Sequence, residues 1–148
     1  MKAISLWQPW ASLWLTERKK HETRHWQTAH RGWLVVHAAK KFPKNLDDEL
    51  IEVLEDEFGG HWGIDLPTGA ILGAVHLDRI VSTNTGVPAH EDDQACGNWA
   101  PDRFGWFASC AVRLAEPIAY RGMQGLFDVP DTAIAPLLDQ IRREYPDL

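Results

Sequence analysis

The sequence predicts an α+β fold built around a small, bent, mostly antiparallel sheet or barrel. Hydrophobic patterning gives strands and helices in the order βαββαβββα, which lacks the regular alternation typical of a parallel sheet. A long apolar strand over residues 70–81 follows Gly69 and contains Gly73, and glycines in a strand permit the bending that a barrel needs. The chain of 148 residues contains no linker-like or repeated tract, so we expect residues 1–148 to form one domain.

The first elements are two strands separated by a helix and an extended segment. Residues 2–5 predict a short strand. A helix begins near Pro9, where the missing N–H of proline costs nothing, and it carries apolar residues at positions i, i+3 and i+4. Residues 33–39 are nearly all apolar and β-prone, which is typical of a strand buried on both faces. We expect His37 in this strand to be a hydrogen-bonded core residue.

The remaining elements are separated by turn signals and one long loop. Asn45 opens a helix whose apolar residues recur at every fourth position. The polar loop over residues 83–103 is long enough to indicate a functional or mobile segment. The other expected elements are strands over 105–115 and 118–120, a glycine-rich turn at 121–127 leading into a last short strand, and a final helix over 136–145.

Charge is unevenly distributed along the chain. The net charge is −6, which argues against a protein that coats duplex DNA. Residues 1–45 nevertheless hold nine Lys and Arg against two Glu, a balance of +7, whereas residues 46–148 have a balance of −13. A basic face on an acidic body fits the local capture of an anionic group. The chain also has eight tryptophans, of which we expect one or two to line a pocket for a flat ligand.

The sequence carries no sign of a membrane segment or a metal site. No apolar run approaches the roughly 18 residues of a membrane span, and the N-terminus lacks the apolar core of a signal peptide. We therefore expect a cytoplasmic protein without a membrane partner. Cys96 and Cys110 are expected to be free thiols, and no Cys or His spacing matches a metal site, so we expect neither a metal nor another cofactor.

The richest concentration of reactive side chains runs from Lys19 to Trp26. If this segment is extended, Glu22, Arg24 and Trp26 share one face, because side chains alternate along a strand. An acid, a planar cation and an aromatic ring on one face suit a planar, polar ligand such as a nucleobase. The alternatives are a solvated edge strand whose charges deter aggregation, or a structural ion pair between Glu22 and Lys19 or Arg24.

Several motifs resemble the ASCH domain family. The most specific is Lys19-x-x-Glu22-Thr23-Arg24-x-Trp26, similar to the G-x-K-x-x-E-x-R block of the family, although the family's glycine before the lysine is absent here. The other matching segments are Leu6-Trp7-Gln8-Pro9-Trp10-Ala11-Ser12-Leu13, His30-Arg31-Gly32, His37-Ala38-Ala39-Lys40, Leu66-Pro67-Thr68-Gly69-Ala70-Ile71-Leu72-Gly73 and Gly122-Met123-Gln124-Gly125-Leu126. The resemblance implies a PUA-like β-barrel with flanking helices, related to RNA-binding and modified-base-reading domains.

The resemblance also implies two functions. Small bacterial members are amidohydrolases that remove the acyl group from N4-acetylcytidine with a Lys, a Thr and a Glu, and other members bind RNA or act as single-strand ribonucleases. The lysine corresponds to Lys19, but Glu22 occupies the place of the threonine, and Thr23 would face away in a strand. The family glutamate lies farther along the chain, and we expect it at Glu91 in the long loop.

These correspondences predict an amidohydrolase of N4-acylated cytosine nucleosides. Glu22 would activate a water, while Lys19 would stabilise the oxyanion or protonate the leaving amine. Arg24 would hold the base carbonyl or a phosphate, and Trp7 or Trp26 would stack on the pyrimidine. The residues expected to bind substrate are Trp7, Gln8, Arg24 and Trp26. The alternative is a module that binds RNA or modified nucleosides, or a single-strand ribonuclease, without amidase activity.

Overall fold

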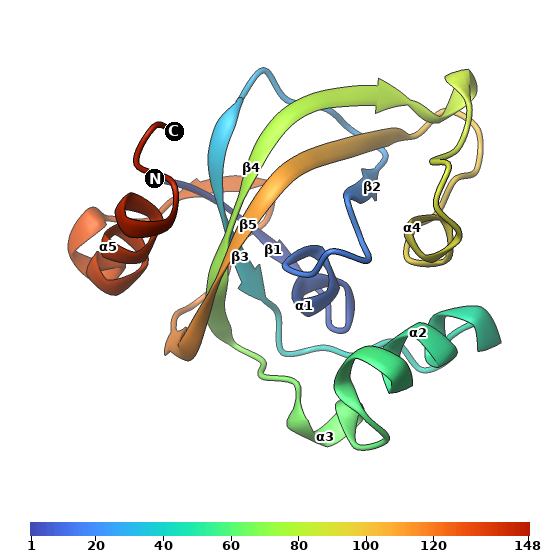
Figure 1. Cartoon of the computed structure of the whole chain (residues 1–148), viewed down its shortest axis with the longest axis horizontal. Helices are drawn as coiled ribbons and strands as arrows, with labels where there is room; N and C mark the ends of the chain where they lie inside the picture. Colours follow the sequence, from blue (N-terminus) through green and yellow to red (C-terminus); the bar gives the residue numbers. More distant parts are fainter.

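The structure, a computed structural model, describes residues 1–148 and has one six-stranded sheet that curls into a half-barrel, with helices around it (Figure 1). The strand order is β2-β5-β4-β3-β1-β6. The strands are β1 (Lys2–Leu6), β2 (His21–Arg24), β3 (Gly32–Ala38), β4 (Ala70–Ser82), β5 (Phe104–Ala119) and β6 (Leu126–Asp128). The α+β class with a small bent sheet is thereby confirmed.

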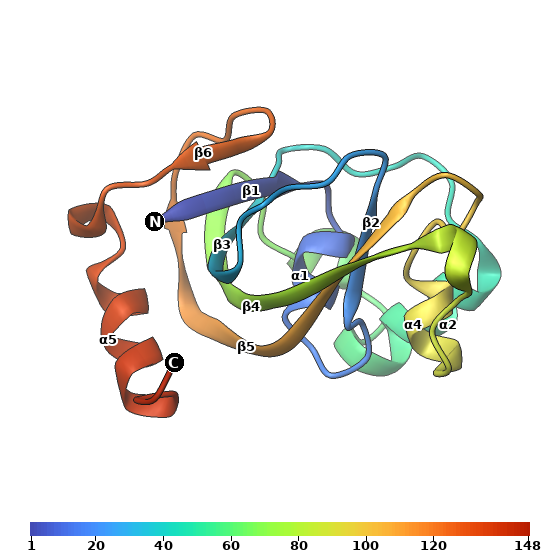
Figure 2. The same cartoon turned by 90° about the horizontal axis from the view of Figure 1, so that it is seen from above.

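Five α-helices and two short 3₁₀ turns surround the sheet. They are α1 (Trp10–Trp14), α2 (Asp48–Phe58), α3 (Trp62–Asp65), η1 (Thr83–Thr85), α4 (Glu91–Ala95), η2 (Asp131–Ala133) and α5 (Ala135–Glu144). Figure 2 shows α5 at one end of the sheet and α2 and α4 at the other. None of the helices combines the length and the apolar character needed to cross a membrane.

The sheet is mostly antiparallel, as predicted. Only β1 and β3 run parallel, and the chain between them passes through α1 and β2. The other neighbouring pairs, β1 with β6, β2 with β5, β3 with β4 and β4 with β5, are antiparallel. The strand β2 therefore lies at one edge of the sheet, where it is held by residues Phe104 to Phe107 of β5.

The bend of the sheet is concentrated in β4 and β5. Their register shifts three times, and the first shift lies between Ile71 and Gly73. At Gly73 the backbone of β5 approaches so closely that a Cβ would lie 2.0 Å from the carbonyl oxygen of Val112. Register shifts of this kind increase the local twist and bend a strand. The expectation that Gly73 marks a bend is confirmed.

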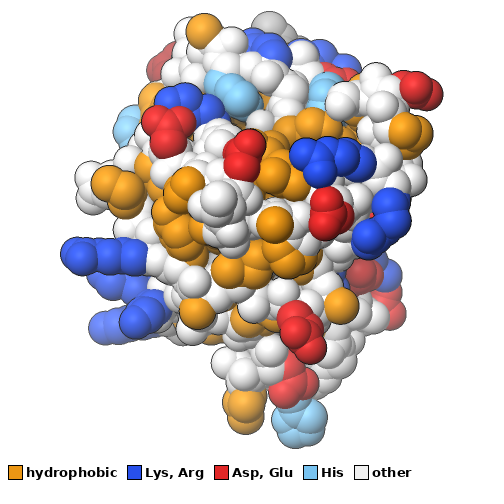
Figure 3. All heavy atoms as spheres, turned by 90° about the vertical axis from the view of Figure 1, so that its left-hand side faces the viewer, with side chains coloured by type: hydrophobic (Ala, Val, Ile, Leu, Met, Phe, Trp, Pro, Cys, Tyr) orange, Lys and Arg blue, Asp and Glu red, His pale blue; other side chains and the backbone are white.

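Apolar side chains pack on both faces of the sheet. In β3, Leu34 and Val36 contribute to one core cluster and Val35 to the other, and all three are fully buried, as the continuous apolar pattern predicted. The helix α5 covers the second cluster with Leu137 and Ile141, each of which stabilises the fold by roughly 1.5–3 kcal/mol. Figure 3, seen from the α5 side, shows apolar side chains gathered near the centre with charges around them.

The element boundaries differ from the sequence expectations in three places. The strands expected at 105–115 and 118–120 are one strand, β5. Pro117 lies between the pairs Gly73–Arg113 and Ile71–Ile118, where the register shifts, and proline is tolerated at such a bulge because no ladder hydrogen bond is lost. The helix expected from Asn45 begins at Asp48, with Asp47 still extended. The loop over 83–103 contains η1 and α4.

Candidate functional site

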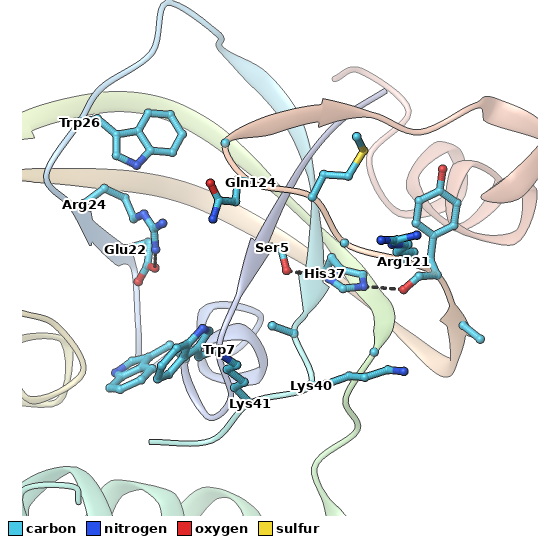
Figure 4. Close-up of a pocket in the computed structure, with 18 of the residues that line it drawn as sticks. Ser5, Trp7, Glu22, Arg24, Trp26, His37, Lys40, Lys41, Arg121 and Gln124 are labelled. Carbon is cyan, nitrogen blue, oxygen red and sulfur yellow. Dashed lines mark hydrogen bonds and ion pairs between the residues drawn. The ribbon is translucent and has the colours of Figure 1, made fainter. Parts of the chain in front are cut away.

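An open pocket of about 1370 Å³ lies beside the central strands (Figure 4). Its walls come from β1 and the residues after it, from β2 and the residues after it, from the end of β3 and the segment that follows, and from residues 119–125 between β5 and β6. In Figure 4, Glu22 and Arg24 lie at one end of the pocket, Ser5 and His37 in the middle, and Lys40 and Arg121 toward the other end.

Glu22 enters the pocket wall from β2 and is paired with a buried lysine. The Lys19 Nζ atom lies 2.6 Å from Glu22 Oε1, and the side chains are 0% and 7% exposed. Lys19 does not line the pocket, whereas Glu22 does. The pair is therefore a carboxylate facing the pocket with a buried cation behind it. The oxyanion role expected for Lys19 does not fit this geometry, because its ammonium group does not reach the cavity.

Arg24 follows Glu22 on the same face of β2. Its Nη1 lies 3.5 Å from Glu22 Oε2, and its Cζ lies 5.8 Å from the ring centroid of Trp26. The Nε atom of Arg24 is buried without a hydrogen-bond partner. Glu22, Arg24 and Trp26 all line the pocket. The strand β2 ends at Arg24, so strand periodicity accounts for the common face of Glu22 and Arg24, whereas Trp26 reaches the pocket from the bend that follows. The guanidinium group retains donors for a ligand.

Trp7 forms part of the opposite wall. It is 47% exposed, which is high for a tryptophan, and Lys41 Nζ lies 5.7 Å from its ring centroid. An exposed indole beside a cation offers a flat apolar surface next to a positive charge. Such a surface suits the stacking of an aromatic ring that carries a phosphate.

Two residues expected at the site lie elsewhere. Gln8 is fully buried and does not line the pocket, and its amide bonds Ser12 and the carbonyl oxygen of Pro67. These hydrogen bonds stabilise the start of α1, so the Gln8 amide has a structural role and does not contact a ligand in the pocket. Glu91 is the first residue of α4 and lines a separate acidic hollow near Arg18, away from Glu22. The motif did not indicate where Glu91 lies relative to Glu22, because the path of the long loop cannot be predicted from the sequence.

Thr23 faces away from the pocket, as expected for its position in a strand. It is buried, and its Oγ1 accepts a hydrogen bond of 2.9 Å from the backbone N–H of Asn98. This bond attaches the segment after α4 to β2. The structure thus places the threonine of the motif in a structural contact.

The structure also brings Lys40, Lys41 and Arg121 to the pocket, which the expected set of binding residues did not include. The cationic residues that line it are Arg24, Lys40, Lys41 and Arg121, against the single carboxylate of Glu22. The chain as a whole has a net charge of −6. In the sequence, the positive charge balance of residues 1–45 was the only indication of a basic site. Arg121 lies outside that segment, so its place in the pocket could not be predicted. The pocket is therefore a positive area on an acidic protein.

A hydrogen-bonded pair, Ser5 and His37, lies in the middle of the pocket (Figure 4). Ser5 Oγ is 2.8 Å from His37 Nδ1, and His37 Nε2 is 2.7 Å from the carbonyl oxygen of Tyr120. His37 is 2% exposed, and its burial lowers the pKa of the imidazole below the ordinary value. The expectation of a hydrogen-bonded, buried histidine is confirmed, although the ring also contributes to the pocket.

No group of three or more His, Cys, Asp or Glu side chains in the chain is arranged to hold a metal ion. Cys96 and Cys110 are free thiols, as expected. Burial raises the pKa of the Cys96 thiol to about 11, so this group is protonated at neutral pH. Cys96 therefore has the character of a small core residue rather than a nucleophile.

Comparison with known proteins identifies the family. Activating signal cointegrator 1 from Homo sapiens is 36% identical over 81 residues, and the Mus musculus protein is 33% identical over 81 residues. In both cases the match includes 50% of this chain but spans only 13% of the relative's length.

The crystal structure of ASCH from Zymomonas mobilis has the same fold. Its TM-score is 0.57 at 13% sequence identity, with 93% of each chain covered, and two mutant structures of that protein give 0.55 and 0.54. Likeness at this identity concerns the fold alone. The ASCH domain profile matches residues 4–120, most of the chain. This protein belongs to the ASCH domain family.

Proposed function

We propose that the pocket binds a nucleotide unit, either within single-stranded RNA or as a modified cytosine nucleoside. The observation that carries this proposal is the lining of the pocket, in which four cationic side chains and exposed tryptophan surface meet on a chain of net charge −6. A base offers a flat ring for stacking, and a phosphate offers the negative charge that the cations complement. Membership of the ASCH family supports this ligand class, because other members bind RNA.

The two ends of the proposed ligand have separate binding groups. Trp7, exposed and close to Lys41, is placed to stack on the base. Arg24 presents a planar fork of donors that matches a phosphate or a base carbonyl. Lys40 and Arg121 extend the positive lining toward the other end of the pocket.

Truncation of the stacking and charged groups should weaken RNA binding. For a short single-stranded RNA, we expect Trp7→Ala to raise Kd by roughly 5- to 150-fold, since stacking on an aromatic residue contributes about 1–3 kcal/mol per base. Arg24→Gln should also raise Kd and should reduce the salt dependence of binding, because one phosphate contact is lost. Fluorescence anisotropy at several salt concentrations measures both effects.

Arg142→Gln provides the matched control for Arg24→Gln. Arg142 is an exposed arginine of α5, paired only with Asp139 and outside the pocket. Its removal should change Kd by less than twofold. Equal effects of the two substitutions would contradict the proposed site, because binding would then follow net charge rather than the pocket.

Amide hydrolysis of N4-acylated cytidine is the second candidate function. It is favoured by the carboxylate of Glu22, which faces the pocket between two cations. Glu22 would take a proton from the attacking water and return it to the N4 nitrogen as the bond between the acyl carbon and N4 breaks, which releases the carboxylic acid and cytidine. Arg24, which reaches the cavity, would stabilise the oxyanion. Lys19 would orient the carboxylate from behind. This arrangement assigns the oxyanion contact to Arg24 instead of Lys19.

Turnover of N4-acetylcytidine tests the second candidate. Glu22→Gln keeps the size of the side chain but removes the base, so the rate of cytidine release should fall by roughly 10²- to 10⁴-fold. Glu49→Gln, an exposed change on α2, should leave the rate unaltered. Chromatography of the nucleosides measures the rate, and gel analysis of RNA in the same reactions reports any ribonuclease activity. Absence of cytidine with the wild-type protein would exclude hydrolysis of this substrate while leaving the binding proposal intact.

A further inference from the structure

The hydrogen bonds around His37 fix the direction in which Ser5 donates. The carbonyl oxygen of Tyr120 can only accept, so His37 Nε2, 2.7 Å away, carries the proton and donates it. In a neutral imidazole the other nitrogen is then an acceptor. His37 Nδ1 therefore accepts from the hydroxyl of Ser5, at 2.8 Å. The single proton of the Ser5 hydroxyl is therefore donated to His37 Nδ1 and is not available to a ligand.

Burial and packing hold this arrangement in place. His37 is 2% exposed, and burial favours the neutral ring by lowering the pKa of His37. Gly122 packs directly against the pair, since a Cβ there would lie 2.6 Å from His37 Cε1 and 2.8 Å from Ser5 Oγ. The residues between β5 and β6 thus close over the imidazole while Ser5 remains part of the pocket lining.

A hydroxyl oxygen has one proton and two lone pairs. With its proton directed to His37, Ser5 presents only lone pairs to a ligand, and no other protein partner binds its Oγ. Ser5 is therefore an obligate acceptor in the middle of the pocket. A ligand carbonyl placed there would meet an oxygen without an available donor, whereas a ligand N–H would complete the chain of hydrogen bonds.

We propose that Ser5 is a specificity-determining residue that selects bases with an exocyclic N–H, such as cytosine and adenine, over bases with a carbonyl at the same position, such as uracil and hypoxanthine. This inference rests on the proposed binding of a base in the pocket and names the class of base. An N4-acylated cytosine also satisfies it, because the acylated nitrogen retains one N–H. The relevant feature of the ligand is thus a hydrogen-bond donor on the ring edge.

Titration with CMP, UMP, AMP and IMP, followed by tryptophan fluorescence or calorimetry, tests this inference. CMP and AMP carry an exocyclic amino group at the position where UMP and IMP, respectively, carry a carbonyl. The wild-type protein should bind CMP roughly three- to tenfold more tightly than UMP and show the same preference for AMP over IMP, which is the effect of one hydrogen bond. Ser5→Ala should reduce both preferences to about one.

Ser109→Ala is the matched control, because Ser109 is exposed on β5 and lies outside the pocket. Circular dichroism and a thermal melt establish that Ser5→Ala is folded, and the wild-type preferences test the inference without any variant. Equal binding of amino and carbonyl bases by the wild type would overturn the inference while the proposed function stands. A preference that survives in Ser5→Ala would assign the selection to another residue and overturn it too. Failure of all four nucleotides and of RNA to bind would overturn the proposed function itself.

Discussion

Lys19→Met should lower the free energy of unfolding by about 3–5 kcal/mol. Lys19 is fully buried, and its ammonium group lies 2.6 Å from a carboxylate that is itself 7% exposed. Removal of the lysine leaves the charge of Glu22 in a poorly solvated position, where only Arg24, at 3.5 Å, remains nearby. The cost arises mainly from this uncompensated charge. Urea denaturation measures it as a lower midpoint without a change of slope.

The neighbouring residue supplies a matched control. Lys20 forms the same type of pair, with Glu17 three residues earlier at 2.5 Å, but these side chains are 30% and 88% exposed. Exposed pairs of this kind contribute about 0–1 kcal/mol, so Lys20→Met should have little effect.

A double substitution separates charge from packing. Lys19→Met combined with Glu22→Leu removes both charges and should recover much of the stability lost in Lys19→Met, because a buried ion pair stabilises little relative to apolar residues. Equal losses in Lys19→Met and Lys20→Met would contradict the burial of the Lys19 pair. Failure of the double variant to recover would contradict the assignment of the loss to the uncompensated charge of Glu22.

Strand periodicity was sufficient to predict one wall of the pocket. Glu22 and Arg24 lie two residues apart in β2, so their common face follows from local geometry alone. The same periodicity directs Thr23 away from the pocket. The α+β class could be predicted for a similar reason. The order of the elements and the presence of Gly73 in a strand can be read from the sequence without knowledge of long-range contacts.

The other wall depends on contacts that no local pattern contains. Lys40 and Arg121 are 81 positions apart and line one cavity only because β3, β4 and β5 pair and the sheet curls. An ion pair between Lys19 and Glu22 was one of the alternatives open from the sequence, but the complete burial of Lys19 behind the carboxylate was not. The helix α1 ends at Trp14, and the turn that follows, rather than the end of a helix, directs the lysine into the core. Motif matching assigned Glu91 to the site without any such contact, and the structure places Glu91 at a separate hollow from Glu22.

Gly73→Ala is the second change for which we expect a large effect, a loss of about 3 kcal/mol in the free energy of unfolding. The new Cβ would lie 2.0 Å from the carbonyl oxygen of Val112 and 3.1 Å from the Cα of Arg113. Both are backbone atoms of β5, so no side chain can rotate to relieve the overlap, and the two longest strands must separate. Thermal melts and urea denaturation measure the loss.

Gly63→Ala tests whether the effect of Gly73→Ala belongs to its position. Gly63 lies in α3, and a Cβ at this position would meet no neighbouring atom within 4 Å, so alanine there should be neutral or stabilise the helix by up to about 1 kcal/mol. Because β4 bends where Gly73 meets β5, the folded fraction of Gly73→Ala should also bind RNA more weakly. Stability equal to that of Gly63→Ala would show that close approach at Gly73 is dispensable. The bend would then depend on the register shifts farther along β4, between Val75 and Arg79.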